Sequence, residues 1–301
     1  HQRPADDGRQ DDLRAVRGIG VGGPAAGSIS AHRGGPRGAR ARAGQVRVRI
    51  ADLIALRLPP YHWWRTVFFL IPAISVYTII LGAASIVSSL FDRHGYFAHG
   101  CARAWSWLIL RTTGVRVAVE GLDRLQPNTT YVFVSNHQSI YDTPVVFASL
   151  PYQIRIIAKA SLARFPVLGW HLTRGGHLFV DRQHPDRAGI LARWRALVSE
   201  GLSLIVYAEG GRSADGLVGR FKAGSFLLAI EAGLPIVPVA VIGTRQVMPK
   251  GRLRTEPADV RLVIHDPIQP PAISSPTIQD ARALAGRVHD DFRQNGLPPG
   301  F

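Results

Sequence analysis

Hydrophobic and polar positions divide the chain into three regions, and the middle one is dominated by a long apolar stretch. From Thr66 to Phe91 there are 26 residues without a charged side chain, and about 20 suffice to cross a bilayer. Trp63, Trp64 and Arg65 precede the stretch, as expected of an anchor at a membrane interface. We therefore predict that residues 51–113 hold membrane-anchoring helices.

A second stretch, from Tyr96 to Leu110, is amphipathic and rich in aromatic residues. Arginines flank the apolar region on both sides, whereas a single span would place one flank on the side of the membrane that basic residues avoid. These flanks favour a membrane-embedded helical hairpin over a single span, with the second helix returning along the interface. Pro72 and Gly82 mark the expected bend.

Residues 114–301 alternate short β-branched runs with helical patterns, which is typical of an α/β fold in which helices cover a sheet. Sites in such folds gather at the carboxyl ends of the strands. The predicted strands are Val115–Glu120, Tyr131–Ser135, Ile154–Lys159, Leu204–Ala208, Ile236–Ile242 and Val260–His265. The predicted helices are Thr143–Leu150, Leu162–Leu172, Pro185–Glu200, Phe221–Ala232 and Ile278–Arg293.

Composition and charge narrow the classes of function. One cysteine in 301 residues excludes a disulfide framework and a Cys-based zinc site. The net charge of +15 suits a polyanionic partner. Residues 1–50 hold ten Arg and four Asp but no aromatic residue to stack a base, so we expect a disordered Arg/Gly-rich tail and no nucleic acid partner. No apolar segment follows early enough for a signal peptide.

A candidate base lies directly after the predicted strand that ends at Ser135. His137 and Asp142 are five residues apart, at the end of the strand and the start of a helix. A turn at this spacing lets the carboxylate fix one imidazole nitrogen and leaves the other free as a base. By itself the pair carries little weight, and a helix N-cap at Asp142 with a surface loop at His137 explains it better. Two such ligands are too few for a metal site.

A candidate anion site follows the strand that ends at Ala208. Gly210 and Gly211 let backbone amides approach an anion, and the guanidinium of Arg212 suits a phosphate. Lys222 follows about ten residues later at the start of a helix, and Arg182 lies near another strand end. No G-x-S-x-G sequence is present, which argues against a serine hydrolase.

The order of four blocks resembles the glycerolipid acyltransferases related to bacterial 1-acylglycerol-3-phosphate acyltransferase. The blocks read NHQSIYD (Asn136–Asp142), GHLFVDR (Gly176–Arg182), YAEGGRS (Tyr207–Ser213) and IVPVAV (Ile236–Val241). The resemblance covers about Gly114 to His265 and the hydrophobic N-terminal helices. Two blocks depart from the family pattern: FPEGTRS has become YAEGGRS, and KxEL has lost its Glu in Lys159-Ala160-Ser161-Leu162.

The resemblance implies a glycerolipid-acyltransferase-like sheet with His137 and Asp142 as catalytic residues. His137 would take the proton of the sn-2 hydroxyl of lysophosphatidate, which attacks the thioester of acyl-CoA or acyl-carrier protein to form phosphatidate. No further cofactor and no metal are expected. The residues implied to hold the acceptor phosphate are Glu209, Gly210, Arg212, Ser213, Arg182, Lys159 and Lys222.

Other acceptors remain open at this point, because the YAEGGRS block is altered. Lyso-ornithine lipid or glycerol 3-phosphate would use the same chemistry, and a membrane module that binds anionic lipid without turnover is a different class. Membrane lipids are expected partners in each case. The expected location is the cell inner membrane, with the catalytic domain on the cytoplasmic face.

Overall fold

A seven-stranded sheet is the centre of the protein, in a computed structural model that describes residues 59–92, 94–181 and 186–296. The strand order is β1-β7-β6-β2-β5-β3-β4. The strands are β1 (Arg116–Glu120), β2 (Val132–Ser135), β3 (Ile154–Lys159), β4 (Leu178–Val180), β5 (Ser203–Tyr207), β6 (Ile236–Ile242) and β7 (Asp259–Ile264). Five strands from β6 to β4 are parallel, while β7 runs antiparallel to β6 and pairs in parallel with β1. The α/β fold class is confirmed. The predicted tail of residues 1–50 lies outside the described residues.

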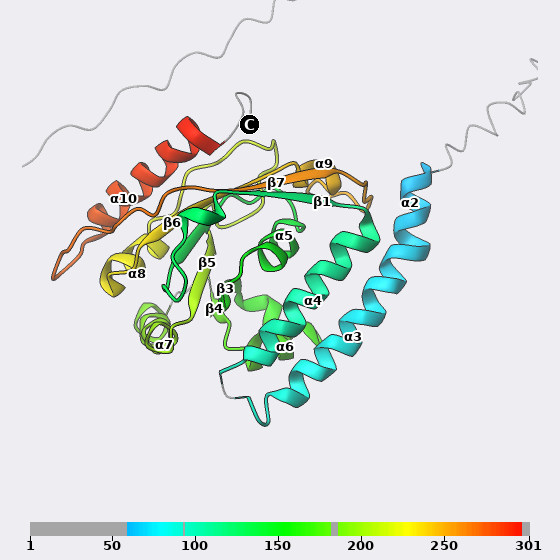
Figure 1. Cartoon of the computed structure of the whole chain (residues 1–301), viewed down its shortest axis with the longest axis horizontal. Coiled ribbons are helices and arrows are strands. Elements are labelled where there is room, and N and C mark those ends of the chain that lie inside the picture. The colour runs from blue at the N-terminus through cyan, green and yellow to red at the C-terminus, as the bar shows by residue number, and fades with distance from the viewer. Residues whose placement is uncertain (1–58, 93, 182–185, 297–301) are drawn as a thin grey trace, which may run out of the picture. The chain divides into compact units, whose positions relative to one another are not determined.

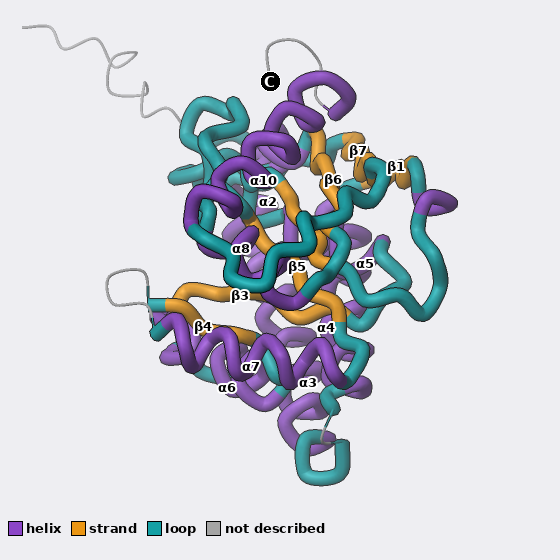
Figure 2. Tube along the Cα trace, turned by 90° about the vertical axis from the view of Figure 1, so that its left-hand side faces the viewer, coloured by secondary structure: helices purple, strands orange, loops and turns teal. Residues whose placement is uncertain are grey.

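Helices cover both faces of the sheet, because successive side chains of each strand point to opposite faces. On β2, Phe133 packs into the core under α4 (Tyr96–Thr113) and α5 (Asp142–Ser149). Val132 and Val134 pack into a second core on the other face (Figure 1). That core lies under α7 (Arg187–Ser199), α8 (Gly224–Ala232) and α10 (Ile278–Asp291), and Figure 2 shows α8 and α10 side by side.

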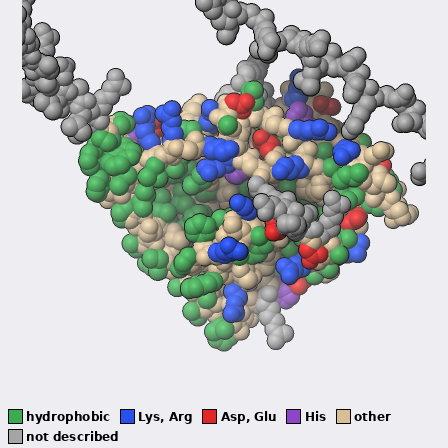
Figure 3. Space-filling view, turned by 180° about the vertical axis from the view of Figure 1, so that it is seen from behind, with side chains coloured by type: hydrophobic (Ala, Val, Ile, Leu, Met, Phe, Trp, Pro, Cys, Tyr) green, Lys and Arg blue, Asp and Glu red, His purple; other side chains and the backbone are tan. Residues whose placement is uncertain are grey.

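The N-terminal helix is the most exposed apolar element. The segments α2 (Tyr61–Arg65), η1 (Thr66–Leu70) and α3 (Ile71–Ser88) join into one helix of 28 residues, which is long and apolar enough to cross a membrane. Seven large hydrophobic side chains of this helix are more than half exposed: Tyr61, Phe68, Phe69, Val76, Ile79, Ile80 and Val87. Figure 3 shows hydrophobic side chains gathered along one side of the molecule. This exposed apolar helix indicates membrane association.

The helical pair is present, but the predicted bend is wrong. The chain turns after Ser88, and Asp92 accepts hydrogen bonds from the backbone N–H groups of Gly95 and Phe97 at the start of α4. Pro72 lies after the wide π-helical turn of η1, which accommodates its missing N–H group without breaking the helix. Gly82 serves close packing: a Cβ there would lie 2.3 Å from Cγ1 of Val167.

The second helix also differs from the predicted membrane-embedded hairpin. α4 packs against α3 on one side and against α5 on the other. Ala98, Ile109 and Leu110 are buried on α4, and the indole N–H of Trp105 donates to Thr78 Oγ1 at 2.7 Å. The aromatic residues of this stretch therefore face in part toward the protein, and α3 carries most of the exposed apolar surface.

Three further elements differ from the predictions. Pro166 divides the predicted helix Leu162–Leu172 into a 3-10 turn, η3 (Ala160–Arg164), and α6 (Leu168–Arg174), because a proline has no N–H group to continue the helix. β4 is only three residues long, and the short helix α9 (Thr244–Val247) lacks an apolar period. The other predicted strands and helices are confirmed within one to three residues at their ends.

Candidate active site

His137 and Asp142 form a direct pair at the carboxyl end of β2. Nδ1 of His137 lies 2.7 Å from Oδ2 of Asp142. A carboxylate only accepts, so Nδ1 carries the proton and Nε2 is left with a free lone pair. Nε2 has no hydrogen-bond partner among the described residues, and the His137 side chain is 18% exposed to solvent. The geometry therefore provides an oriented base open to solvent.

Asp142 is fully buried and receives four hydrogen bonds. Oδ2 accepts from His137 and from the backbone N–H groups of Gln138 (2.7 Å) and Ser139 (2.9 Å). Oδ1 accepts from the Thr244 hydroxyl at 2.5 Å. Asp142 is the first residue of α5, but the donors come from the loop before it and from α9. The carboxylate is thus fixed from two sides in a single orientation.

Three neighbouring parallel strands bring this site together. β2 lies between β5 and β6, so the loops after all three meet at one edge of the sheet. Asn136 joins β2 to β6 through two hydrogen bonds with the backbone of Val241, at 2.8 and 2.9 Å. Thr244 lies two residues after the end of β6. Sequence reasoning missed Thr244, and its position just after the Ile236–Ile242 strand was the available signal.

Tyr207, the last residue of β5, stacks on the imidazole of His137. The ring centroids are 4.2 Å apart and the planes differ by 20°. The Tyr207 hydroxyl lies 2.9 Å from the hydroxyl of Thr143, and burial raises the pKa of the phenol. Tyr207 stands where the resembling family has Phe. Its ring limits the rotation of His137, a role that the sequence did not assign.

Glu209 holds two loops against the histidine. Oε1 accepts from the backbone N–H of His137 at 2.8 Å, and Oε2 accepts from that of Gly219 at 3.0 Å. Burial raises the pKa of this carboxyl group, although the two N–H groups oppose the shift. Both oxygens are thus engaged by the backbone, which gives Glu209 a positioning role; direct contact with a phosphate stays a prediction.

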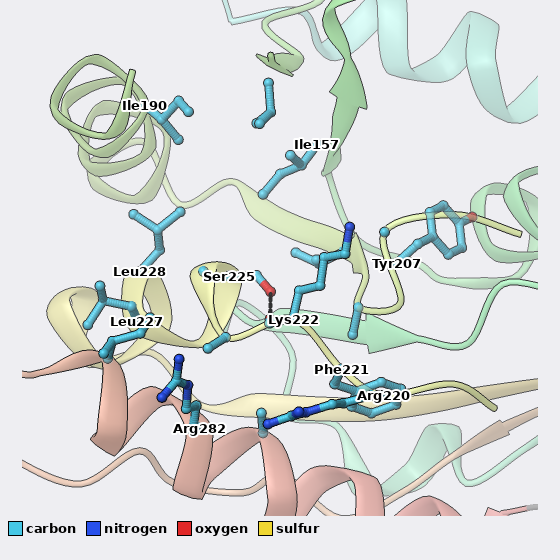
Figure 4. Close-up of a pocket in the computed structure, with 18 of the residues that line it drawn as sticks. Ile157, Ile190, Tyr207, Arg220, Phe221, Lys222, Ser225, Leu227, Leu228 and Arg282 are labelled. Carbon is cyan, nitrogen blue, oxygen red and sulfur yellow. Dashed lines mark hydrogen bonds between the residues drawn. The ribbon is translucent and has the colours of Figure 1, made fainter. Parts of the chain in front are cut away.

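A groove of about 1380 Å³ contains three of the predicted phosphate ligands. Lys159, Gly210 and Lys222 line it together with Tyr207. Figure 4 shows Tyr207 toward one end of the groove, Lys222 and Ile157 near its middle, and Ile190, Leu227 and Leu228 toward the other end, where Arg282 lies beside Leu227. Gly210 has φ +71°, and a Cβ there would lie 2.7 Å from the Lys222 ammonium. The groove therefore combines cations with apolar side chains, and we call it the amphiphilic groove.

The remaining predicted ligands lie elsewhere. Arg212 is half-buried and does not line this groove, and its carbonyl accepts from Lys250 Nζ at 2.9 Å. The Ser213 hydroxyl donates to Asp215, while its backbone N–H donates to the carbonyl of His137 at 2.7 Å. Arg182 lies outside the described residues. In the described part of the chain, no three His, Cys, Asp or Glu side chains come together as a metal site would require.

Known proteins similar to this chain are acyltransferases. Residues 116–242 match the family model described as Acyltransferase. The 1-acyl-sn-glycerol-3-phosphate acyltransferase BAT2 of Brassica napus is 36% identical over 183 residues, which cover 60% of this chain and 53% of the relative. The human 1-acyl-sn-glycerol-3-phosphate acyltransferase alpha is 30% identical over 177 residues, 58% of this chain and 62% of the relative. The chain thus spans about half the length of BAT2 and of the related LPAT1 of Arabidopsis thaliana.

A solved structure shares the fold. The 1-acyl-sn-glycerophosphate acyltransferase PlsC of Thermotoga maritima superposes with a TM-score of 0.62 and 25% sequence identity, covering 78% of this chain and 98% of PlsC. The matched family segment runs from β1 to β6 and so includes His137, Asp142, Tyr207 and Glu209. The predicted resemblance to the acyltransferases is confirmed, and residues 116–242 of this chain match the Acyltransferase family model.

Proposed function

We propose that this protein is an O-acyltransferase that moves a fatty acyl group from acyl-CoA or acyl-carrier protein to the sn-2 hydroxyl of lysophosphatidate. The product is phosphatidate, an intermediate of phospholipid biosynthesis. The observation that carries the proposal is the His137–Asp142 pair, held at one edge of the sheet with Nε2 open to solvent. The names of the sequence relatives and of PlsC support the choice of acceptor.

His137 acts as the general base in this proposal. Nε2 takes the proton of the acceptor hydroxyl as its oxygen attacks the thioester carbonyl. The new ester C–O bond forms, the C–S bond breaks, and the thiolate leaves and is protonated by the imidazolium or by water. Asp142 stabilises the imidazolium that forms, as a buried carboxylate beside Nδ1 does in other His–Asp pairs. No acyl-enzyme is needed, because the acceptor supplies the nucleophile.

The amphiphilic groove supports an anionic lipid as the acceptor. Lys159 and Lys222 suit the phosphate, while Ile190, Leu227 and Leu228 suit a hydrocarbon chain. Membrane association adds to this, because it confines enzyme and lysolipid to one surface and aligns them. We place the protein at the inner membrane with its catalytic domain on the cytoplasmic face, where thioester donors are made.

Thiol release from a long-chain acyl-CoA tests the proposal, with membranes that carry the wild type or His137→Ala. Lysophosphatidate and lyso-ornithine lipid are offered as separate acceptors. We expect release that depends on His137 with lysophosphatidate. Release with lyso-ornithine lipid alone would keep the chemistry and replace the acceptor. Equal release by His137→Ala would remove the catalytic assignment.

A further inference from the structure

A second groove, of about 660 Å³, has a lining that shares no residue with the amphiphilic groove. It is formed by residues 214–216 and by residues 243–256. Four basic residues line it: Arg245, Lys250, Arg252 and Arg254. Asp215 and Glu256 are the acidic side chains of the lining, so the groove has a net charge of +2. We call it the basic groove.

The walls of the basic groove are the loops that hold the His137–Asp142 pair. Gly216 accepts a hydrogen bond from Gln138 Nε2 at 2.7 Å, next to His137. Gly243 and Arg245 line the groove on either side of Thr244, whose hydroxyl binds Asp142. A molecule in the basic groove therefore lies within a few residues of the His137–Asp142 pair.

Two of the four cations are available to a ligand. Arg254 is paired with Glu256, and Arg245 donates to the carbonyl of Ala214 at 2.9 Å near Asp215. Lys250 uses its ammonium group for one hydrogen bond, to the Arg212 carbonyl, and two donors remain. Arg252 is exposed, and its guanidinium group makes no hydrogen bond or ion pair within the described residues. Lys250 and Arg252 therefore present uncompensated positive charge.

The lining differs in kind from that of the amphiphilic groove. Apart from Ala214 and Pro249 it holds no apolar side chain, and no aromatic ring is among its lining residues. Such a surface cannot hold a fatty acyl chain, since nothing there would replace the water around it. It suits a soluble polyanion of nucleotide size, bound through its phosphates.

The basic groove also lies beside the exposed apolar helix. Arg65 donates to the Thr255 carbonyl, and the Thr255 N–H donates to Thr66 Oγ1 at 3.0 Å, so the loop with Arg252 and Arg254 is tied to the start of that helix. Figure 3 shows Lys and Arg side chains next to the hydrophobic surface on this face. An amphiphile with a charged head and a long chain can occupy both surfaces at once.

We propose that the basic groove binds the phosphate groups in the nucleotide part of acyl-CoA. This inference rests on the proposed function and adds a location for the donor. Acyl-CoA carries a diphosphate and a 3′-phosphate, which match the charge that Lys250 and Arg252 leave open. Its thioester then lies near His137, because the loops that line the basic groove also hold the His137–Asp142 pair.

Steady-state kinetics of the double variant Lys250→Ala/Arg252→Ala test the inference. The matched control is Arg193→Ala/Arg195→Ala, which removes two exposed charges from α7. Lysophosphatidate is presented in phosphatidylcholine vesicles, so that the bilayer itself carries little charge. We expect the KM for acyl-CoA to rise about tenfold in the test variant, as loss of charge-assisted phosphate contacts requires, and that of the control to stay unchanged.

A second arm measures binding without turnover, in the wild type and in the test variant. Adenosine 3′,5′-bisphosphate should compete with acyl-CoA, and the competition should weaken with added salt and in the test variant. Several outcomes would overturn the inference. In one, the KM for acyl-CoA is unchanged although turnover depends on His137. In the others, the KM rises for lysophosphatidate or only for acyl-carrier protein. Absence of any His137-dependent turnover would instead refute the proposed function, while competition for binding remained measurable.

Discussion

Asp142→Asn separates the charge of Asp142 from its geometry. The three N–H donors converge on Oδ2, and the Thr244 hydroxyl alone faces Oδ1. An asparagine can place its carbonyl oxygen at the Oδ2 position and its amide NH₂ toward Thr244, whose hydroxyl oxygen can also accept. All four contacts then persist. The variant should fold with little change in melting temperature, and only the negative charge is lost.

The size of the effect follows from the distance. Two unit charges about 4 Å apart interact by about 4 kcal/mol at an effective dielectric constant of about 20. Asp142 is fully buried, so little solvent screens it from an imidazolium on His137. Since each 1.36 kcal/mol is a factor of ten in rate, kcat should fall by about a thousandfold.

Thiol release at saturating acyl-CoA and lysophosphatidate measures this loss. Asp259→Asn is the matched control, because Asp259 is an exposed carboxylate paired with Arg116 on an outer strand, and its activity should equal that of the wild type. A fall of less than about tenfold in Asp142→Asn, with an unchanged melting temperature, would refute the reasoning. The charge of Asp142 would then not stabilise the imidazolium.

Three other predictions concern the acceptor, pH and the membrane. Lys159→Ala/Lys222→Ala should raise the KM for lysophosphatidate by about tenfold and leave that for acyl-CoA within about twofold. If initial-rate kinetics showed the reverse pattern, the substrates assigned to the two grooves would have to be exchanged. Burial, with a smaller contribution from Arg155, lowers the pKa of His171 to about 4. As the pH falls from about 6.5 to 4, the His171 imidazole therefore takes up a proton in the unfolded chain before it does so in the folded one. Thermal melts should show stability lost in that window, and His171→Gln should lose less; an equal loss in both would exclude His171 as a cause. Phe68→Ser/Phe69→Ser should reduce co-sedimentation with phosphatidylcholine vesicles, because both side chains are exposed; unchanged co-sedimentation would place the membrane contact elsewhere.

Much of the fold could be predicted from local pattern. The strands Ile154–Lys159 and Ile236–Ile242 were predicted with their observed ends, because β-branched runs bounded by turns are a strong signal for buried parallel strands. β4 is absent from the six predicted strands, because a run of three residues is too short to show a period. The predicted bend at Pro72 and Gly82 was wrong for a different reason. Gly82 allows close packing against Val167, which is far away in the sequence.

The sequence by itself determined the types of residue at the candidate site and the order of the blocks that carry them. His137 and Asp142 are five residues apart, so a single turn can bring them together. Only the tertiary structure decided the partners of that pair, since Thr244, Tyr207 and Glu209 reach it from other strands. The structure likewise decided that Lys159 and Lys222 share a groove and Arg212 does not. Contacts between loops depend on strand order in the sheet, and no local pattern in a single chain encodes that order.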